Sequence, residues 1–433
     1  MPMPTEARTG ALGVVARVPH ARGTDETRAD RIALVHDWLN QDGGAEHVLG
    51  VMHDMYPAAP IYTTMADARR VGAVRDWDVK VSWMDRLPGI HGWHQPYLAL
   101  YPLAWETTRV RGYDLVLSNK SGFCHGVRTG GAPHVCYCLT PTRYVWEPAD
   151  YLEYEDVPAA ARLLLAAALP ALRRWDRAAA DRVDDFVAIS TTVQNRIARY
   201  YGRTSVVIHP PVEIASYHID AAAEDFYLVL ARLVPYKRID LAVKAFSALG
   251  RRLVVVGDGR DRARLESLAA PTVSFAGHLP RTEVVDLLAR SRGLVWPGVE
   301  DYGLAPVEAM ASGRPVIARR AGGVLDTVIE GATGVFFDDA DPASLAAAVR
   351  AAEAIEWRPE EIRRHAAQFG REAFEERLGA HVTAVLAETR RGGRQPGRRV
   401  GRQAGRLAGR GQAGGMAPDR TDGNGSGGDD GRS

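Results

Sequence analysis

Two glutamates eight residues apart are the residues of this sequence most suited to chemistry. Glu300 and Glu308 follow the apolar run 293–296, which we predict to be a strand. Pro306 suits the first position of a helix, where its missing N–H has no partner in any case, so we expect a helix over 306–311. Glu308 is then in the first turn, beside free N–H groups that attract anionic oxygens. Carboxylates accept hydrogen bonds from sugar hydroxyls and free amides suit phosphate, so this loop suits a sugar nucleotide. The alternative is a capping residue and a solvated acid.

Two cations are expected at the same edge of the same sheet. Arg232 and Lys237 follow the predicted strand 226–230, on a loop before a predicted helix. Fixed positive charges there could neutralise the diphosphate charge that develops when a nucleotide leaves a sugar. The alternative is that both side chains lie on a solvated face.

A glycine pair follows the predicted strand 252–256. Gly257 and Gly259 flank Asp258, but Arg262 stands where a dinucleotide-binding fingerprint needs its third glycine. We interpret this segment as a tight turn that lets the backbone approach a nucleotide; a plain turn is the alternative.

The first half of the chain carries weaker candidates, namely Asp37, Gly43, Gly44, His125, Arg143 and Tyr144. His125 is either a catalytic base or a satisfied histidine of the interior. Tyr144 could stack on a pyranose ring, or simply pack in the core. The sequence holds no metal-binding helix, Walker loop or serine elbow, so we expect neither a metal nor a cofactor.

These residues need two sheets to position them. In the first half, strands are predicted at 31–36, 79–83, 115–118, 135–138, 185–189 and 205–208, with helices at 45–55, 163–180 and 192–200. In the second half, strands are predicted at 226–230, 252–256, 273–276, 293–296, 315–318 and 334–337, with helices at 240–249, 262–268, 283–289, 306–311, 325–330 and 344–352. Such alternation predicts an α/β protein with two doubly wound, Rossmann-like domains. Their ligands bind at the carboxyl ends of the strands, which places the site in a cleft near the hinge.

Composition divides the chain further. With 433 residues, 46% hydrophobic, 25% charged and a formal charge of +1, it is neither mostly disordered nor marked by charge as a nucleic-acid protein. We expect a disordered leader at 1–30, a first domain at 31–212, a second at 224–372, a helix at 373–390 that returns to the first domain, and a tail at 391–433. The tail holds nine Arg, four Asp and 14 Gly, so we predict that it is disordered; an arm that touches RNA or lipid headgroups is the alternative.

The cysteines and apolar runs bear on location. Cys124, Cys136 and Cys138 are odd in number and lack metal or redox spacing, which favours reduced, buried thiols in the cytosol. The first thirty residues contain no sustained apolar run of a signal peptide, and the run 163–172 is too short to span a bilayer. We therefore expect a cytoplasmic protein. Helix 162–177, with Arg173 and Arg174, either contacts the inner face of a membrane or packs as a core helix.

Taken together, these motifs resemble the retaining glycosyltransferases of family 4. The resemblance lies in Glu300 and Glu308 with Tyr302-Gly303-Leu304, in the Arg232 to Lys237 loop, and in Gly257-Asp258-Gly259. The segments 36–46 and 137–146 resemble the branch that holds mannosyltransferases of bacterial surface-polysaccharide assembly. The resemblance covers about residues 31–386 and implies the two-domain GT-B fold. Leu139 stands where that branch usually carries His, which leaves the acceptor open.

The resemblance also implies roles. Glu308 holds the ribose, Glu300 contacts the donor sugar, and Arg232 with Lys237 holds the diphosphate. His125 lies near the sugar, and Gly43 and Gly44 let the first domain close over the donor. Adding the residues discussed above, we expect the catalytic set Glu300, Arg232, Lys237 and His125; the donor-binding set Glu308, Gly303, Leu304, Ala305, Gly257, Gly259, Gly43 and Gly44; and the acceptor-side set Asp37, Tyr144 and Arg143.

We therefore expect a retaining transfer of a hexosyl group from a nucleotide sugar to a glycan or lipid-linked acceptor, without a metal. The resemblance suggests mannose from GDP-mannose. Two other hypotheses remain open at this point: a silent sensor or scaffold that binds sugar nucleotides, and a sugar-nucleotide epimerase on the same fold.

Overall fold

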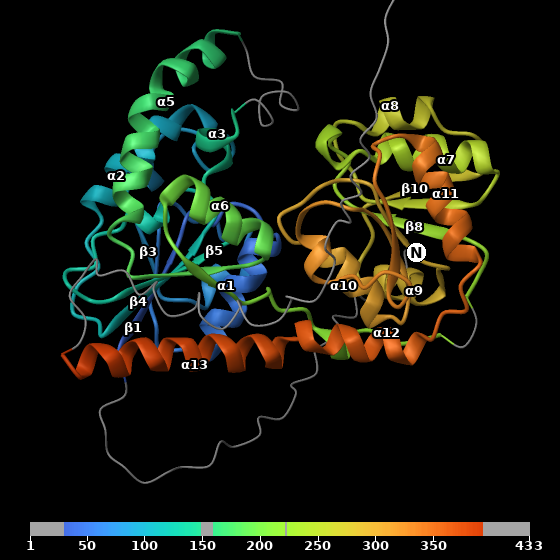
Figure 1. The fold of residues 1–433 in the computed structure, drawn as a ribbon. Helices are drawn as coiled ribbons and strands as arrows, with labels where there is room; N and C mark the ends of the chain where they lie inside the picture. Colours follow the sequence, from blue (N-terminus) through green and yellow to red (C-terminus); the bar gives the residue numbers. More distant parts are fainter. Residues whose placement is uncertain (1–29, 149–158, 221–222, 393–433) are drawn as a thin grey trace, which may run out of the picture. The chain divides into compact units, whose positions relative to one another are not determined.

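The computed structural model describes residues 30–148, 159–220 and 223–392. In these residues two sheets form, every strand pair in both is parallel, and helices flank the sheets (Figure 1). This confirms the predicted fold class of two Rossmann-like units. The expected leader and nearly all of the expected tail lie outside the described residues.

The first sheet has seven strands in the order β3-β2-β1-β4-β5-β6-β7. They are β1 (Ile32–His36), β2 (Ile61–Thr63), β3 (Val79–Val81), β4 (Leu115–Lys120), β5 (His134–Cys138), β6 (Asp185–Ala188) and β7 (Ser205–Val207). Strands β1, β4 and β5 are buried along their whole length, as expected of parallel strands covered on both faces. The strand order reverses between β1 and β4, which makes their carboxyl ends a switch point where ligands bind in such sheets.

Helices cover the first sheet. They are α1 (Gly44–Met55), α2 (Tyr101–Thr107), α3 (Arg143–Trp146), α5 (Ala159–Ala180) and α6 (Thr191–Tyr201). In α1 the residues Val48, Leu49, Val51 and Met52 share the face that packs on the core. Ser190 caps α6 by accepting a hydrogen bond from the Val193 N–H, and Gly202 ends the helix in the left-handed region.

The second sheet has six strands in the order β10-β9-β8-β11-β12-β13, with its own switch point between β8 and β11. They are β8 (Tyr227–Leu230), β9 (Leu253–Val256), β10 (Val273–Gly277), β11 (Leu294–Trp296), β12 (Val316–Arg319) and β13 (Gly334–Phe337). The helices are α7 (Ile239–Leu249), α8 (Arg262–Ser267), α9 (Arg281–Arg290), α10 (Leu304–Ala311), α11 (Pro342–Glu353) and α12 (Pro359–Ala366).

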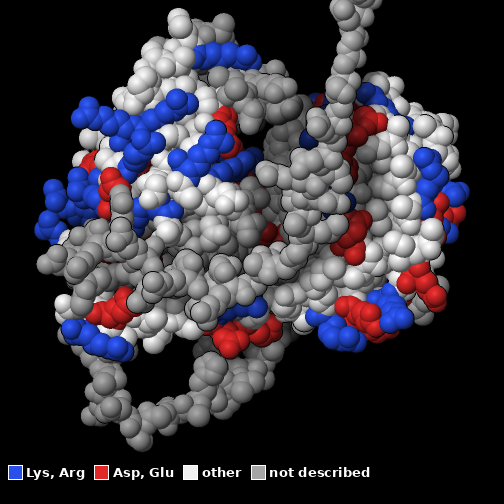
Figure 2. All heavy atoms as spheres, in the orientation of Figure 1, with Lys and Arg blue, Asp and Glu red and all other residues white. Residues whose placement is uncertain are grey.

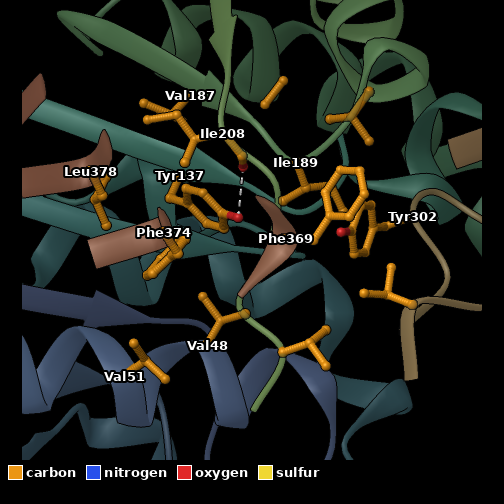
Figure 3. Close-up of a cluster of buried hydrophobic side chains, with 14 of the residues drawn as sticks. Val48, Val51, Tyr137, Val187, Ile189, Ile208, Tyr302, Phe369, Phe374 and Leu378 are labelled. Carbon is orange, nitrogen blue, oxygen red and sulfur yellow. Dashed lines mark hydrogen bonds between the residues drawn. The ribbon is translucent and has the colours of Figure 1, made fainter. Parts of the chain in front are cut away.

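A last helix returns along the first sheet. Helix α13 (Arg371–Arg390) buries Phe374, Leu378, Val382, Val385 and Leu386, which recur at helical spacing on one face. The Phe374 ring meets the Tyr137 ring edge to face at 5.5 Å, and the Tyr137 hydroxyl donates to the Ile208 carbonyl at 3.0 Å (Figure 3). The same apolar cluster includes Tyr302 from the second half of the chain.

The element predictions fail in a few places. β2 is only three residues long, between Pro60 and a polar turn, and no periodic signal marks it. The segment 325–330, expected as a helix, holds instead the end of a short 3-10 turn at Gly322–Asp326. Helix α12 was not predicted, because its apolar positions are few.

Charge is unevenly distributed on the face drawn in Figure 2. Lys and Arg side chains gather near α2 and α5, whereas both signs are mixed over the second half of the chain. No helix in the described part of the chain is long and apolar enough to cross a membrane. The three cysteines are buried and form no disulfide.

Candidate active site

A pocket of about 500 Å³ opens where the carboxyl ends of both sets of strands meet. The second half contributes the end of β8 (Leu230), the end of β11 (Trp296) and the start of α10. The first half contributes the start of α1 (Gly44) and the loop after β5 (Leu139). The remaining lining residues are Ala45, Val48, Thr140, Arg143, Ile189, Pro210, Tyr236, Lys237, Glu300, Asp301, Tyr302, Gly303, Leu304, Ala305 and Glu308. The lining therefore contains both glutamates and one of the two predicted cations.

Glu300 and Lys237 form an ion pair in this pocket. The Lys237 side chain is 11% exposed and that of Glu300 22%, so solvent screens the pair only partly. The Lys237 ammonium also lies 5.1 Å from the centre of the Trp296 ring and 5.5 Å from that of Tyr236. A cation held between a carboxylate and two aromatic faces is well placed to meet a charged ligand.

Glu308 is held by Arg281, an arginine that the sequence patterns did not single out. Arg281, the first residue of α9, lies 2.9 Å from the Glu308 carboxylate and also donates to the Tyr217 hydroxyl. Burial, and then the Glu308 charge, raise the pKa of Tyr217. Burial acts to lower the pKa of Arg281, but the Glu308 charge outweighs it, so that pKa is raised.

The helix that carries Glu308 begins earlier than predicted. α10 starts at Leu304, after Gly303 with φ of 92°, so Pro306 is the third helical residue and Glu308 lies in the second turn. Glu308 therefore does not lie beside the free amides of the first turn, and that expectation is wrong. The free amides belong to Leu304 and Ala305, which line the pocket.

Arg232 does not line this pocket. Its side chain is exposed and donates to the Tyr236 hydroxyl at 3.3 Å. Gly257 and Gly259 do not line the pocket either. Both lie where the backbone of a neighbouring loop leaves no room for a side chain. A Cβ at Gly257 would overlap the Ala231 carbonyl oxygen, and one at Gly259 that of Leu233. These glycines let the loop after β9 lie against the loop after β8.

Of the two glycines at the start of α1, Gly43 and Gly44, only Gly44 lines the pocket. A Cβ there would lie 3.0 Å from the Leu304 Cδ1 atom, so the start of α1 closely approaches the start of α10. Gly43 is the N-cap residue of α1.

His125, Asp37 and Tyr144 lie in the interior, so the structure does not support their expected contacts with substrate. His125 is fully buried, with its Nε2 atom 3.2 Å from the Asp176 carbonyl oxygen. Burial lowers the pKa of His125 well below its ordinary value. Tyr144 packs edge to face on Phe123 at 5.5 Å.

The Asp37 carboxylate has a structural partner for each oxygen. It accepts backbone N–H groups from Ser121 at 2.7 Å, Gly122 at 2.6 Å, Phe123 at 2.6 Å and Cys124 at 2.7 Å. Asp37 thus holds the turn after β4, and no lone pair is left to serve an acceptor.

Arg143 does reach the pocket, but it pairs with a residue that the sequence analysis passed over. Its guanidinium lies 2.8 Å from the Asp301 carboxylate. Asp301 is adjacent to Glu300, so position alone could have marked it. Arg281 could have been found by the rule used for Arg232, since it follows β10 at the same sheet edge. In the described residues, no group of three or more His, Cys, Asp or Glu could hold a metal ion.

Comparison with known proteins gives a family for part of the chain. Residues 219–373 match the family model of glycosyl transferases group 1. A glycogen synthase of Mycobacterium tuberculosis is 35% identical over 182 residues, which are 39% of this chain and 44% of that protein. A GDP-mannose-dependent phosphatidylinositol monomannoside mannosyltransferase of Mycolicibacterium smegmatis is 28% identical over 214 residues, which are 42% of this chain and 56% of that protein. The chain thus spans about half the length of these relatives.

Solved structures share the fold over more of the chain. HepE of Anabaena, solved in complex with UDP, has a TM-score of 0.62 at 19% identity and covers 82% of this chain and 100% of its own. A sucrose-phosphate synthase of Thermosynechococcus elongatus has a TM-score of 0.63 at 19% identity and covers 83% of this chain and 99% of its own. At such identity the likeness establishes the two-unit fold and nothing further.

Proposed function

We propose, from the match of residues 219–373 to the family model of glycosyl transferases group 1, that the chain is a retaining glycosyltransferase. It moves a hexosyl group from a nucleotide sugar to a glycan or lipid-linked acceptor. The observation that carries the proposal is the shared pocket of Glu300, Lys237 and Glu308 at the carboxyl ends of both sheets.

The chemistry assigned to these residues follows from their charges. Lys237 offsets negative charge on the diphosphate as the bond to the sugar breaks, in a pocket where screening is reduced. Glu308, oriented by Arg281, accepts the ribose hydroxyls. Glu300 accepts a donor-sugar hydroxyl, with Lys237 holding its carboxylate. The acceptor hydroxyl attacks the anomeric carbon of the donor sugar from the face that the leaving phosphate vacates. That phosphate takes the proton of the acceptor hydroxyl, so no enzyme nucleophile is needed.

The donor sugar is part of the proposal. One relative is named as GDP-mannose-dependent, and HepE was solved with UDP. We propose a hexosyl donor with mannose as the first candidate. Lys and Arg side chains gather near α5 (Figure 2), and α5 itself carries the exposed residues Arg173 and Arg174. Both observations support an acceptor anchored at an anionic membrane surface.

The purified full chain should release nucleoside diphosphate from GDP-mannose or another GDP- or UDP-hexose when acceptor is present. Glu300→Gln removes one charge of the central pair, and Lys237→Ala removes the other. Each should lower turnover by roughly a hundredfold, a loss of about 3 kcal/mol of transition-state stabilisation.

Arg251→Ala is the matched control, because Arg251 pairs with Glu353 at 2.9 Å and neither residue lines the pocket. Its turnover should remain near that of the unmodified protein. Full activity of both pocket variants would defeat the assignment, and calorimetric binding of sugar nucleotides without turnover would favour a sensor instead.

A further inference from the structure

Asp301, the residue after Glu300, connects the loop between β11 and α10 to helices of the first half of the chain. The Asp301 side chain is 15% exposed and forms ion pairs with Arg143, from α3, and with Arg196, from α6. The Asp301 carbonyl oxygen also accepts a hydrogen bond from Ser190, the N-cap of α6. Both the side chain and the backbone of Asp301 are therefore held by elements that pack on the first sheet.

Arg196 is itself fixed from the other side. Its guanidinium lies 3.0 Å from Glu147, and the Tyr200 hydroxyl donates to the same Glu147 oxygen at 2.9 Å. Arg143 and Arg196 thus form a cluster with the carboxylates of Asp301 and Glu147. The two positive and two negative charges of this cluster balance. A balanced and largely enclosed cluster holds its geometry better than a single exposed pair.

The loop around Glu300 has little freedom of its own. The Gly323 N–H donates to the Glu300 carbonyl at 2.8 Å, and a Cβ at Gly323 would overlap the Asp301 carbonyl oxygen. Asp326, at the end of the same turn, accepts the Thr191 N–H at 2.6 Å. A shift of Asp301 therefore displaces the Glu300 backbone and with it the carboxylate that pairs with Lys237.

We propose that Asp301, Arg143 and Arg196 form a clamp that positions Glu300 for sugar transfer. The clamp also ties the loop that carries Glu300 to the first half of the chain. This rests on the proposed function, since the position of Glu300 matters to catalysis only if the pocket transfers a sugar. The three are positioning residues, since they act on the reaction through Glu300. Burial acts to lower the pKa of Arg143, but Asp301 outweighs it and leaves that pKa raised, in keeping with a persistent pair.

The test is a double-mutant cycle on the full chain. Arg143→Met breaks one ion pair of the clamp and Asp301→Asn breaks both, and each change keeps much of the side-chain volume. Each single variant should lower kcat about tenfold while the donor KM changes less than about threefold, because the nucleotide contacts at Glu308 are untouched. The double variant should lose little more than Asp301→Asn alone, since that change already removes the pair that Arg143→Met breaks.

Two controls separate positioning from general destabilisation. Arg143→Lys keeps the charge and should restore at least part of kcat. Arg251→Met breaks the Arg251–Glu353 pair, outside the pocket, and should leave kcat unchanged. Independent, multiplicative losses in the double variant, or an unchanged kcat in both single variants, would overturn the clamp.

A second readout does not depend on activity. Because the Gly323 amide is bonded to the Glu300 carbonyl, its hydrogen exchange reports on the loop. Exchange at Gly323 should speed up severalfold in Arg143→Met and Asp301→Asn but not in Arg251→Met. If the unmodified protein transfers no sugar, the proposed function fails, while faster exchange still supports the clamp as a structural device. Unchanged exchange refutes it.

Discussion

At the scale of single residues, side chains with similar sequence signals have different fates. Arg232 and Lys237 were predicted together, yet Lys237 lines the pocket and Arg232 is exposed. The difference comes from the short 3-10 turn at Pro235–Lys237, which turns Lys237 toward Glu300. His125 has the residue type of a base, but it is fully buried and does not line the pocket.

Arg281 is the residue whose proposed role in nucleotide binding is most directly testable. Arg281→Met leaves the Glu308 carboxylate without its ion pair, so that it is oriented less well for the ribose hydroxyls. The dissociation constant for the nucleoside diphosphate, measured by calorimetry, should rise about fivefold to tenfold.

The matched control lies on the same helix. Arg290→Met breaks the pair that Arg290 forms with Glu224 at 2.7 Å and should leave that dissociation constant unchanged. Equal affinities in Arg281→Met and the unmodified protein would refute the role of Arg281.

At the scale of elements, the first sheet buries ionisable groups that do not line the pocket. His134 in β5 is 1% exposed, and its Nε2 atom lies 2.8 Å from the Ser118 hydroxyl. Burial, and then the Arg182 charge, lower the pKa of His134 from 6.5 to about 3. The folded protein thus keeps this histidine neutral where the unfolded chain protonates it.

That difference predicts how stability depends on pH. Below about pH 6.5 the unfolded state binds a proton at His134 and the folded state does not. The contribution of His134 to the free energy of unfolding is therefore fully present above pH 6.5 and is lost as the pH falls from 6.5 to about 3. The contribution is at most about 1.4 kcal/mol per pH unit. Urea unfolding from pH 7 to pH 5 should show the decline in the free energy of unfolding. His134→Gln should reduce the slope of that free energy against pH.

The control is His278→Gln, which changes an exposed histidine and should leave this slope as it is. An equal slope in the unmodified protein and both variants would contradict the prediction.

At the scale of the whole molecule, α13 brings the end of the described chain back to the first sheet. Phe374 is 1% exposed and packs against Tyr137 (Figure 3). Phe374→Ala should lower the free energy of unfolding by about 3–5 kcal/mol through lost burial and a new cavity.

Chemical denaturation measures this change. The control is Glu376→Ala, an exposed position of the same helix, which should shift stability by less than about 0.5 kcal/mol. A similar small shift for Phe374→Ala would mean that α13 contributes little to the packing of the first sheet.

The sequence by itself determined the repeating alternation of strands and helices, the two parallel sheets, and the placing of Glu300, Lys237 and Glu308 on the segments that follow two of the strands. These follow from apolar runs and from glycine and proline positions, which act over a few residues of chain. Only the tertiary structure decided that Arg281 holds Glu308, that Arg143 and Arg196 hold Asp301, and that Asp37 and His125 are interior. The partners in these ion pairs are 27 residues apart for Arg281 and Glu308 and 158 residues apart for Arg143 and Asp301 (301 − 143). No local pattern encodes such a contact, or the burial of Asp37 and His125 within the fold.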